Sequence, residues 1–244
     1  MKLRFAFIAV LVASAPSAAW SQGNSQGNSG QGNGQGNKCS LSSSLVSQLQ
    51  NQLKIVVSGG NGGLFPTNRM WSAVVDRQGV LCSVIQSDPD AWPGSRSIAI
   101  AKASTANDFS NNLLALSTAN LYSFTQPANT QPAQSFPAGS LYGLNNSNPF
   151  NPAFQPQGSG LGSVPGGIIT FGGGVPLYNT NKQVIGGLGV SGDTACADHA
   201  VAYQMRHNAG LDHTPNLDNI VYLDAGELPH DLGHPHCTTH DITP

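Results

Sequence analysis

The sequence predicts an α+β domain, in which helices flank a central, mainly antiparallel sheet and a long irregular insert interrupts the chain. Two observations carry this prediction. Runs of β-forming residues are joined by short turns, which is typical of antiparallel hairpins, and helical patterns stand before and after these runs. The chain of 244 residues is long enough for one domain with a sizeable core.

The start of the chain is predicted to precede the folded domain. Lys2 and Arg4 come before an apolar run, and a small-residue cleavage pattern ends at Ser21, so residues 1–21 are predicted to be a signal peptide. Residues 22–38 repeat Gln, Gly and Asn, a composition that predicts a flexible linker because it offers little apolar surface to bury. We therefore expect a secreted or periplasmic protein, without membrane insertion.

The domain is predicted over 39–227. In its first half, leucines and valines at helical spacing follow Ser40, a good N-cap, and stop at Gly59, while Arg77-Gln78-Gly79 marks a hairpin turn. The predicted elements are a helix from Leu41 to Val56, strands at Met70–Asp76 and Val80–Ser87, a small-residue helix over Ser95–Phe109 and a shorter helix over Asn112–Tyr122.

The second half begins with an insert over 123–160 that is rich in Pro, Asn and Gln. Its length and its aromatic residues predict an arm or pocket cover. A glycine-rich hairpin follows over 165–193, and its bare main chain suggests a surface open to a ligand. Then come a helix over 194–209, with Asp193 as N-cap and Gly210 after its end, a strand over 219–223 and a histidine-rich tail over 228–244.

The four cysteines of an exported chain predict two disulfides. Three pairings are open. The pairs Cys39–Cys82 and Cys196–Cys237 are favoured because each ties a chain end to a predicted core element. A zinc site is the alternative, but no close Cys-x-x-Cys pair supports it.

Four segments, taken in order, resemble a known family. They read VVDRQGVL, KASTANDF, PGGIITFGGGVPL and VIGGLGVSGD, with a further aspartate downstream. This set is similar to the GlcG/HbpS-like, haem-degrading domain proteins, and the similarity runs from about residue 41 to 210. The resemblance implies a profilin-like α+β fold, a homo-oligomer and haem or another flat tetrapyrrole as ligand. It favours a binding protein over an enzyme.

Haem needs an axial ligand and donors or cations for its propionates. On the predicted helix over 194–209, four polar residues share one side at i, i+4, i+7 and i+8: His199, Tyr203, Arg206 and His207. Lys102 and Thr105 match the family's KA-x-TA motif, and Gly173 and Gly174 belong to the glycine-rich hairpin. These eight residues are the candidate haem site. The alternatives are a polar helix face that meets solvent and a lysine whose stem lies along a small-residue helix.

All seven histidines lie between His199 and His240. The tail groups four of them with the spacing of a chelating cluster for zinc, copper or nickel: His230, His234, His236 and His240. The alternative is a solvated tail. A metal-binding accessory protein is thus a second functional hypothesis, and an oligomeric assembly or surface protein is a third.

Other functions lack support. The chain has no basic stripe, which argues against nucleic acid, since charged residues make up only 9% of it. Gly187-x-Gly189-x-x-Gly192 matches the dinucleotide fingerprint, but that motif requires a βαβ unit and the preceding hairpin argues against one. No Gly-x-Ser-x-Gly nucleophile motif is present.

Overall fold

The computed structural model describes residues 38–60, 63–64, 69–127, 141–144, 160–229 and 231–237. The predicted signal peptide, the predicted linker up to residue 37 and most of the 123–160 insert lie outside these ranges. The described part confirms the α+β class, because three α-helices accompany an antiparallel four-stranded sheet.

The principal elements are α1 (Ser43–Ser58), β1 (Trp71–Asp76), β2 (Leu81–Gln86), α2 (Pro93–Phe109), β3 (Gly174–Tyr178), β4 (Val184–Ser191) and α3 (Ala195–Asn208). The strand order is β2-β1-β4-β3 with every neighbouring pair antiparallel. β1 is therefore central, and Val74 on β1 lies opposite Leu188 on β4.

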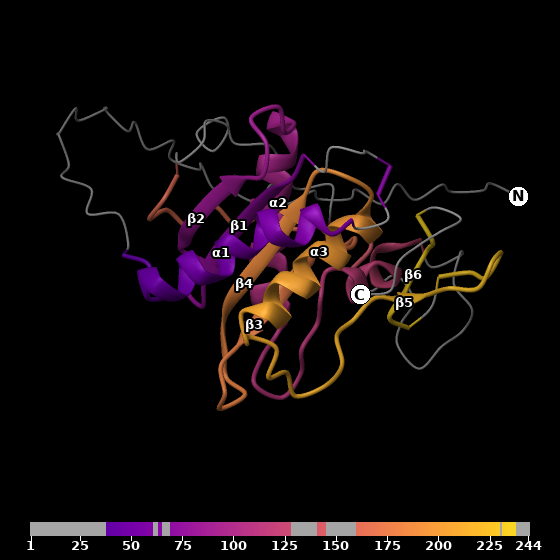
Figure 1. Cartoon of the computed structure of the whole chain (residues 1–244). Helices are drawn as coiled ribbons and strands as arrows, with labels where there is room; N and C mark the ends of the chain where they lie inside the picture. Colours follow the sequence, from indigo (N-terminus) through magenta and orange to yellow (C-terminus); the bar gives the residue numbers. More distant parts are fainter. Residues whose placement is uncertain are drawn as a thin grey trace, which may run out of the picture. The chain divides into compact units, whose positions relative to one another are not determined.

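Helices cover both faces of this sheet (Figure 1). α1 and α3 pack together over one face, where Leu49 and Leu53 of α1 and Val201 of α3 share a fully buried core with Leu188 and Val190 of β4. Because side chains alternate along a strand, the residues between these two β4 positions face the opposite layer. That layer is α2.

α2 approaches the sheet closely because both surfaces are made of small residues. Gly187 and Gly189 of β4 lie against the α2 main chain, and a Cβ at these positions would lie 2.1 Å from the Ala103 carbonyl oxygen and 2.0 Å from the Ala99 carbonyl oxygen respectively. The glycines of β4 thus make room for a helix. The pairing of β4 with antiparallel strands on both sides also confirms that no dinucleotide-binding βαβ unit is formed there.

Two helix starts differ from the prediction by one or two residues. The N-cap of α1 is Ser42, whose hydroxyl accepts from Leu45 N–H, whereas Ser40 donates its own N–H to the Asp76 carboxylate. The N-cap of α3 is Thr194, whose hydroxyl accepts from Ala197 N–H. Serine caps α1 and threonine caps α3, and both are preferred N-cap residues.

The helix predicted over 112–122 is wrong. The segment forms turns, followed by the 3-10 helices η1 (Ala119–Leu121) and η2 (Ser123–Thr125). The Asn111 side chain accepts from Leu113 N–H and Leu114 N–H, and that of Asn120 accepts from Ser117 N–H. Side-chain oxygens that bind nearby main-chain groups in this way compete with helix formation.

The C-terminal segment returns to the domain. β5 (Val221–Tyr222) pairs in parallel with β6 (Gly233–His234), which lies within the predicted tail. Disulfides join Cys39 to Cys82 and Cys196 to Cys237, the pairing that the sequence favours. Within the described ranges, no helix combines the length and apolarity needed to cross a bilayer.

Candidate functional site

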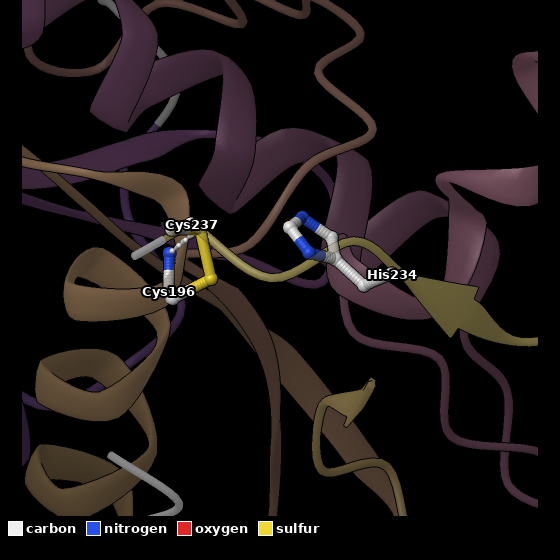
Figure 2. A group of neighbouring side chains, drawn as sticks. All are labelled: Cys196, His234 and Cys237. Carbon is white, nitrogen blue, oxygen red and sulfur yellow. Dashed lines mark hydrogen bonds between the residues drawn. A yellow bond between two sulfur atoms is a disulfide. The ribbon is translucent and has the colours of Figure 1, made fainter. Parts of the chain in front are cut away.

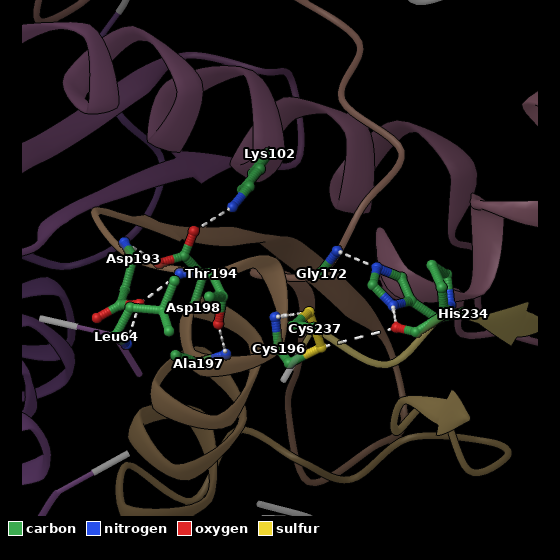
Figure 3. Close-up of a disulfide and its surroundings, with 11 residues drawn as sticks. Leu64, Lys102, Gly172, Asp193, Thr194, Cys196, Ala197, Asp198, His234 and Cys237 are labelled. Atoms are coloured by element: carbon green, nitrogen blue, oxygen red, sulfur yellow. Dashed lines mark hydrogen bonds and ion pairs between the residues drawn. A yellow bond between two sulfur atoms is a disulfide. The ribbon is translucent and has the colours of Figure 1, made fainter. Parts of the chain in front are cut away.

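Three of the four family-like segments meet at the start of α3, where Lys102, Gly172 and Asp193 lie (Figure 3). Lys102 of α2 forms a buried ion pair with Asp198 of α3, with 2.7 Å between Nζ and Oδ2, and also donates to the Val190 carbonyl oxygen at the end of β4. The other Asp198 oxygen accepts from Asp193 N–H. One lysine therefore joins the central helix, the sheet and α3.

Burial disfavours the charged form of both partners of this pair. It lowers the pKa of Lys102, and it raises the pKa of Asp198 to about 6 against the attraction of the lysine. The pair is fully enclosed, and the ring of Phe171 lies 4.8 Å from Nζ. A lysine held in this way stabilises the junction of three elements, and its ammonium group is not exposed to a propionate.

Thr105 has a comparable structural role. Its hydroxyl donates to the Ala101 carbonyl oxygen of its own helix and lies 3.2 Å from the Gly167 carbonyl oxygen, and it accepts from Ile169 N–H. The threonine of the KA-x-TA motif thus holds the segment that leads into β3.

The glycines at 172–174, 186, 187 and 189 are buried, so the hypothesis of an open main-chain surface is wrong at these positions, although the turn over 180–183 is exposed. Gly173 has a φ of +120°, and a Cβ there would lie 2.6 Å from Lys102 Nζ. A Cβ on Gly174 would lie 2.5 Å from the Lys102 carbonyl oxygen. These glycines admit the α2 main chain and the buried lysine.

The four polar residues predicted to share one side of α3 have different environments. His199 is 0% exposed, and its Nε2 lies 3.1 Å from both Asn219 Oδ1 and Ile220 N. Burial lowers its pKa from 6.5 to about 3, so the imidazole is neutral at physiological pH. Its Nδ1 is buried and makes no hydrogen bond to the described residues. His199 belongs to the interior of the domain.

Arg206 is also interior. Its guanidinium forms a two-pronged ion pair with the Asp218 carboxylate at 2.5 and 2.7 Å and donates to the Pro176 carbonyl oxygen. The half-buried Tyr203 lies between His199 and Arg206. Its ring is 5.8 Å from the His199 ring and 4.8 Å from the guanidinium carbon of Arg206. The arginine thus fixes the segment after α3 and is not exposed to an anionic ligand.

His207 is the accessible histidine of the predicted set, with a side chain that is 64% exposed. Its Nδ1 lies 2.7 Å from Asp212 Oδ2. Burial raises the pKa of Asp212, but the hydrogen bond from His207 and the nearby positive charge of Arg206 lower it by more. The pKa of Asp212 is therefore below its ordinary value. No hydrogen bond joins His207 Nε2 to the residues that the structure describes. A carboxylate on one ring nitrogen with the other available is the arrangement of a metal-ligating imidazole.

The tail histidines are only partly described, since His230 and His240 lie outside the described residues. His234 is buried, with its Nδ1 2.7 Å from the Pro235 carbonyl oxygen and its Nε2 accepting from Gly172 N–H. His236 is exposed and stacks on Tyr222 with 4.6 Å between ring centroids. The two described histidines therefore have separate neighbours.

Two hollows in the described part lie elsewhere. One, of about 500 Å³, is lined by Ser40, Leu41, Arg77, Asn111, Asn112, Gln183, Val184 and Ile185. The other, of about 680 Å³, lies along the start of α1 and beside Cys82. None of the eight candidate haem residues lines either one.

Sequence reasoning missed the partners that give these histidines and cations their roles. Asp218 and Asn219 come from the segment after α3, and no local pattern links them to Arg206 or His199. Asp212, the partner of His207, likewise follows α3. Its position two residues after the helix-ending Gly210 was the available signal, because such a turn brings the chain back to the last helical turn.

Comparison with known proteins places the chain in a family. Among solved structures it is similar to protein ORFY of Klebsiella pneumoniae, with 24% identity, coverage of 69% of this chain and 90% of that chain, and a TM-score of 0.48. A heme complex of PduOC is similar with 24% identity, coverage of 69% of this chain and 94% of that chain, and a TM-score of 0.47. HbpS is similar with 20% identity, coverage of 68% of this chain and 86% of that chain, and a TM-score of 0.43. None of the curated proteins matches the chain.

The family described as "Haem degrading protein HbpS-like" matches residues 67–206, which is more than half of the chain. The matched range runs from the segment before β1 to Arg206 near the end of α3 and includes the Lys102–Asp198 junction. The chain therefore belongs to the HbpS-like family of haem degrading proteins.

Proposed function

We propose that this protein binds haem or a related tetrapyrrole, and that His207 of α3 is the axial ligand. Family membership supports the choice of haem. The observation that carries the choice of residue is the Asp212 carboxylate 2.7 Å from His207 Nδ1, on a side chain that is 64% exposed. An imidazole whose Nδ1–H is donated to a carboxylate presents its Nε2 lone pair outward, and bound haem would supply an iron centre to accept it.

The other members of the predicted set support this histidine indirectly. Tyr203 lies one turn before His207 on the same side of the helix and is half-buried, so its ring offers an adjacent surface. The buried ion pairs of Arg206 and Lys102 hold α3 against the segment after it and against α2. Recruiting either cation for a propionate would break such a pair, which is strongly unfavourable.

A hemin titration tests the proposal. The parent protein should show a saturable Soret shift, and His207→Ala should weaken hemin binding by at least about 10-fold, the lower end of what loss of an outer-shell partner costs at metal sites. His213→Ala, another exposed histidine near the end of α3, is the matched control and should bind like the parent.

Two results would contradict the proposal in different ways. If the parent gave no saturable shift, haem binding itself would be wrong. If His207→Ala bound like the parent while His199→Gln lost the shift, the ligand would be the interior histidine. Far-UV circular dichroism of each variant separates loss of binding from loss of fold.

Export and assembly belong to the same proposal. Disulfides persist in oxidising compartments, and two are present in the structure, so they support a secreted or periplasmic location. Fractionation of cells that express the full chain should place it outside the cytoplasm, shortened at its N-terminus. Light scattering of that product should give a mass that is a multiple of the chain if it forms a homo-oligomer.

A further inference from the structure

The disulfide at the start of α3 has a histidine beside it (Figure 2). Cys196 is the second residue of α3, Cys237 follows β6, and His234 is the second residue of β6. One ring nitrogen of His234 and the two sulfur atoms all lie within 4.8 Å of one another. Two sulfurs and an imidazole nitrogen are the donors that zinc prefers.

We propose that reduction of the Cys196–Cys237 disulfide creates a binding site for a thiophilic divalent cation such as Zn²⁺, with two thiolates and His234 as ligands. In the oxidised protein the sulfurs are bonded to each other and the site does not exist. The cation site is thus controlled by the redox state of the chain. It is separate from the proposed haem ligand, His207, and does not depend on it.

The reductant is a dithiol. Its thiolate attacks one sulfur of the disulfide, the other sulfur leaves as a thiolate and takes up a proton, and the second thiol of the reductant then resolves the mixed disulfide. The dithiol leaves as a disulfide, having supplied two electrons and two protons, and the protein gains two thiols. Cys196 is only 3% exposed, but Cys237 is partly exposed and offers a point of attack. Metal binding then releases the two thiol protons.

The surroundings favour thiolates at this position. Cys196 N–H lies 3.1 Å from Cys237 Sγ, so the sulfur sits at the N-terminus of a 14-residue helix. The partial positive charge of a helix N-terminus stabilises a thiolate and lowers thiol pKa values. The same main-chain group that now contacts the disulfide would therefore stabilise the reduced, metal-binding form.

Both ring nitrogens of His234 contact the main chain. Its Nδ1 lies 2.7 Å from the Pro235 carbonyl oxygen, and its Nε2 accepts a 3.3 Å hydrogen bond from Gly172 N–H. Metal binding through Nε2 displaces the Gly172 N–H and leaves Nδ1–H donating to the Pro235 carbonyl oxygen, which orients the ring as outer-shell partners of zinc-bound histidines do. Tyr122 packs on the ring with 5.1 Å between centroids and limits its movement.

A tetrahedral cation with bonds of about 2.3 Å to sulfur holds two sulfurs about 3.8 Å apart, so the two thiolates must separate after reduction. The three protein ligands leave the fourth zinc position to water, a common arrangement.

The second disulfide provides a natural comparison. Asp76 lies beside Cys39 and Cys82, but its carboxylate already accepts from Ser40 N–H, Gln78 N–H and Val80 N–H. A metal there would have to displace these main-chain donors. The pair Cys39→Ser/Cys82→Ser therefore removes the competing thiols and leaves the proposed site as the one cysteine pair of the chain.

The test uses the full chain with Cys39→Ser/Cys82→Ser and titrates it with Co²⁺ without air, before and after reduction with a phosphine. A sulfur-to-cobalt charge-transfer band reports thiolate ligation. The reduced protein should show this band, saturating at one Co²⁺ per chain and reversed by Zn²⁺, and the oxidised protein should not. Adding His234→Ala should weaken Co²⁺ binding at least about 10-fold. His236→Ala, the exposed neighbour, should leave it unchanged.

Each of the following results would overturn the proposal. One is a charge-transfer band that survives in reduced Cys196→Ser/Cys237→Ser but is absent from Cys39→Ser/Cys82→Ser. A second is Co²⁺ binding of equal strength in the oxidised and reduced proteins without the charge-transfer band. A third is an equal loss of Co²⁺ affinity in His236→Ala and His234→Ala. Both of these results place the metal on the tail histidines. In the Cys39→Ser/Cys82→Ser background His234→Ala keeps Cys196 and Cys237, so it remains informative if removal of these two cysteines prevents folding.

Discussion

His199 and His207 are eight residues apart on one helix and have opposite surroundings. His199 is enclosed and held by Asn219 and Ile220, whereas His207 is exposed and held by Asp212. The helix itself does not cause the difference, because both residues lie on the same broad side of it. The segment after α3 covers the first histidine and leaves the second accessible, so only the second is ready to bind an external group.

The buried His199 predicts a pH dependence of stability. Its pKa is about 3 in the folded protein and about 6.5 when unfolded, so the unfolded chain binds the extra proton between these values. Its stabilising contribution is therefore complete above pH 6.5 and is lost as the pH falls toward 3. The contribution of His199 to the unfolding free energy should fall by up to about 1.4 kcal/mol per pH unit in that window, and the raised pKa of Asp198 acts in the opposite direction over part of it.

Urea unfolding at a series of pH values measures this slope. His199→Gln retains a polar group near the Nε2 position but does not titrate, so its slope should be shallower than that of the parent. His213→Gln replaces an exposed histidine and serves as the control. Equal slopes for parent and His199→Gln would show that this histidine does not titrate on unfolding as described.

At the scale of elements, the contact between β4 and α2 organises the domain. Glycines on β4 and alanines on α2 bring strand and helix main chains close together, and this contact positions Lys102 beneath the start of α3. The small residues of α2 allow this close packing. The glycines that suggested an exposed ligand surface are the other half of the same contact.

A substitution in β4 measures the importance of this contact. Gly189→Ala places a methyl group 2.0 Å from the Ala99 carbonyl oxygen, so strand and helix must separate. Overpacking of this kind lowers the unfolding free energy by about 1–3 kcal/mol. Gly94→Ala, in the first turn of α2 with nothing near the added methyl group, should be neutral or stabilising by up to about 1 kcal/mol. Thermal unfolding of both variants checks the contrast.

At the scale of the whole molecule, the two disulfides attach both ends of the described chain to the sheet and helices. Cys39–Cys82 fastens the segment before α1 to β2, and Cys196–Cys237 fastens the segment after β6 to α3. The second disulfide also places His234 against Gly172, in the segment before β3. The C-terminal histidine region is therefore part of the domain as far as residue 237.

Removal of the first disulfide should lower stability without changing the fold. Cys39 and Cys82 are 43 residues apart, and cross-links of this length typically contribute about 2–4 kcal/mol. Cys39→Ser/Cys82→Ser should therefore unfold at lower urea concentration, with the far-UV circular dichroism of the parent. An unchanged unfolding midpoint would show that the cross-link does not contribute to stability under oxidising conditions.

The sequence by itself determined the α+β class, the principal strands and helices and the family, because periodicity, turn residues and segment order are local properties of the chain. It favoured one of three cysteine pairings, which the structure confirms. It failed over 112–122, where asparagine side chains bind the main chain and prevent a helix. Only the tertiary structure decided which candidate residues are accessible. Lys102 pairs with Asp198, 96 residues away, and burial follows from such distant partners, which no local pattern specifies.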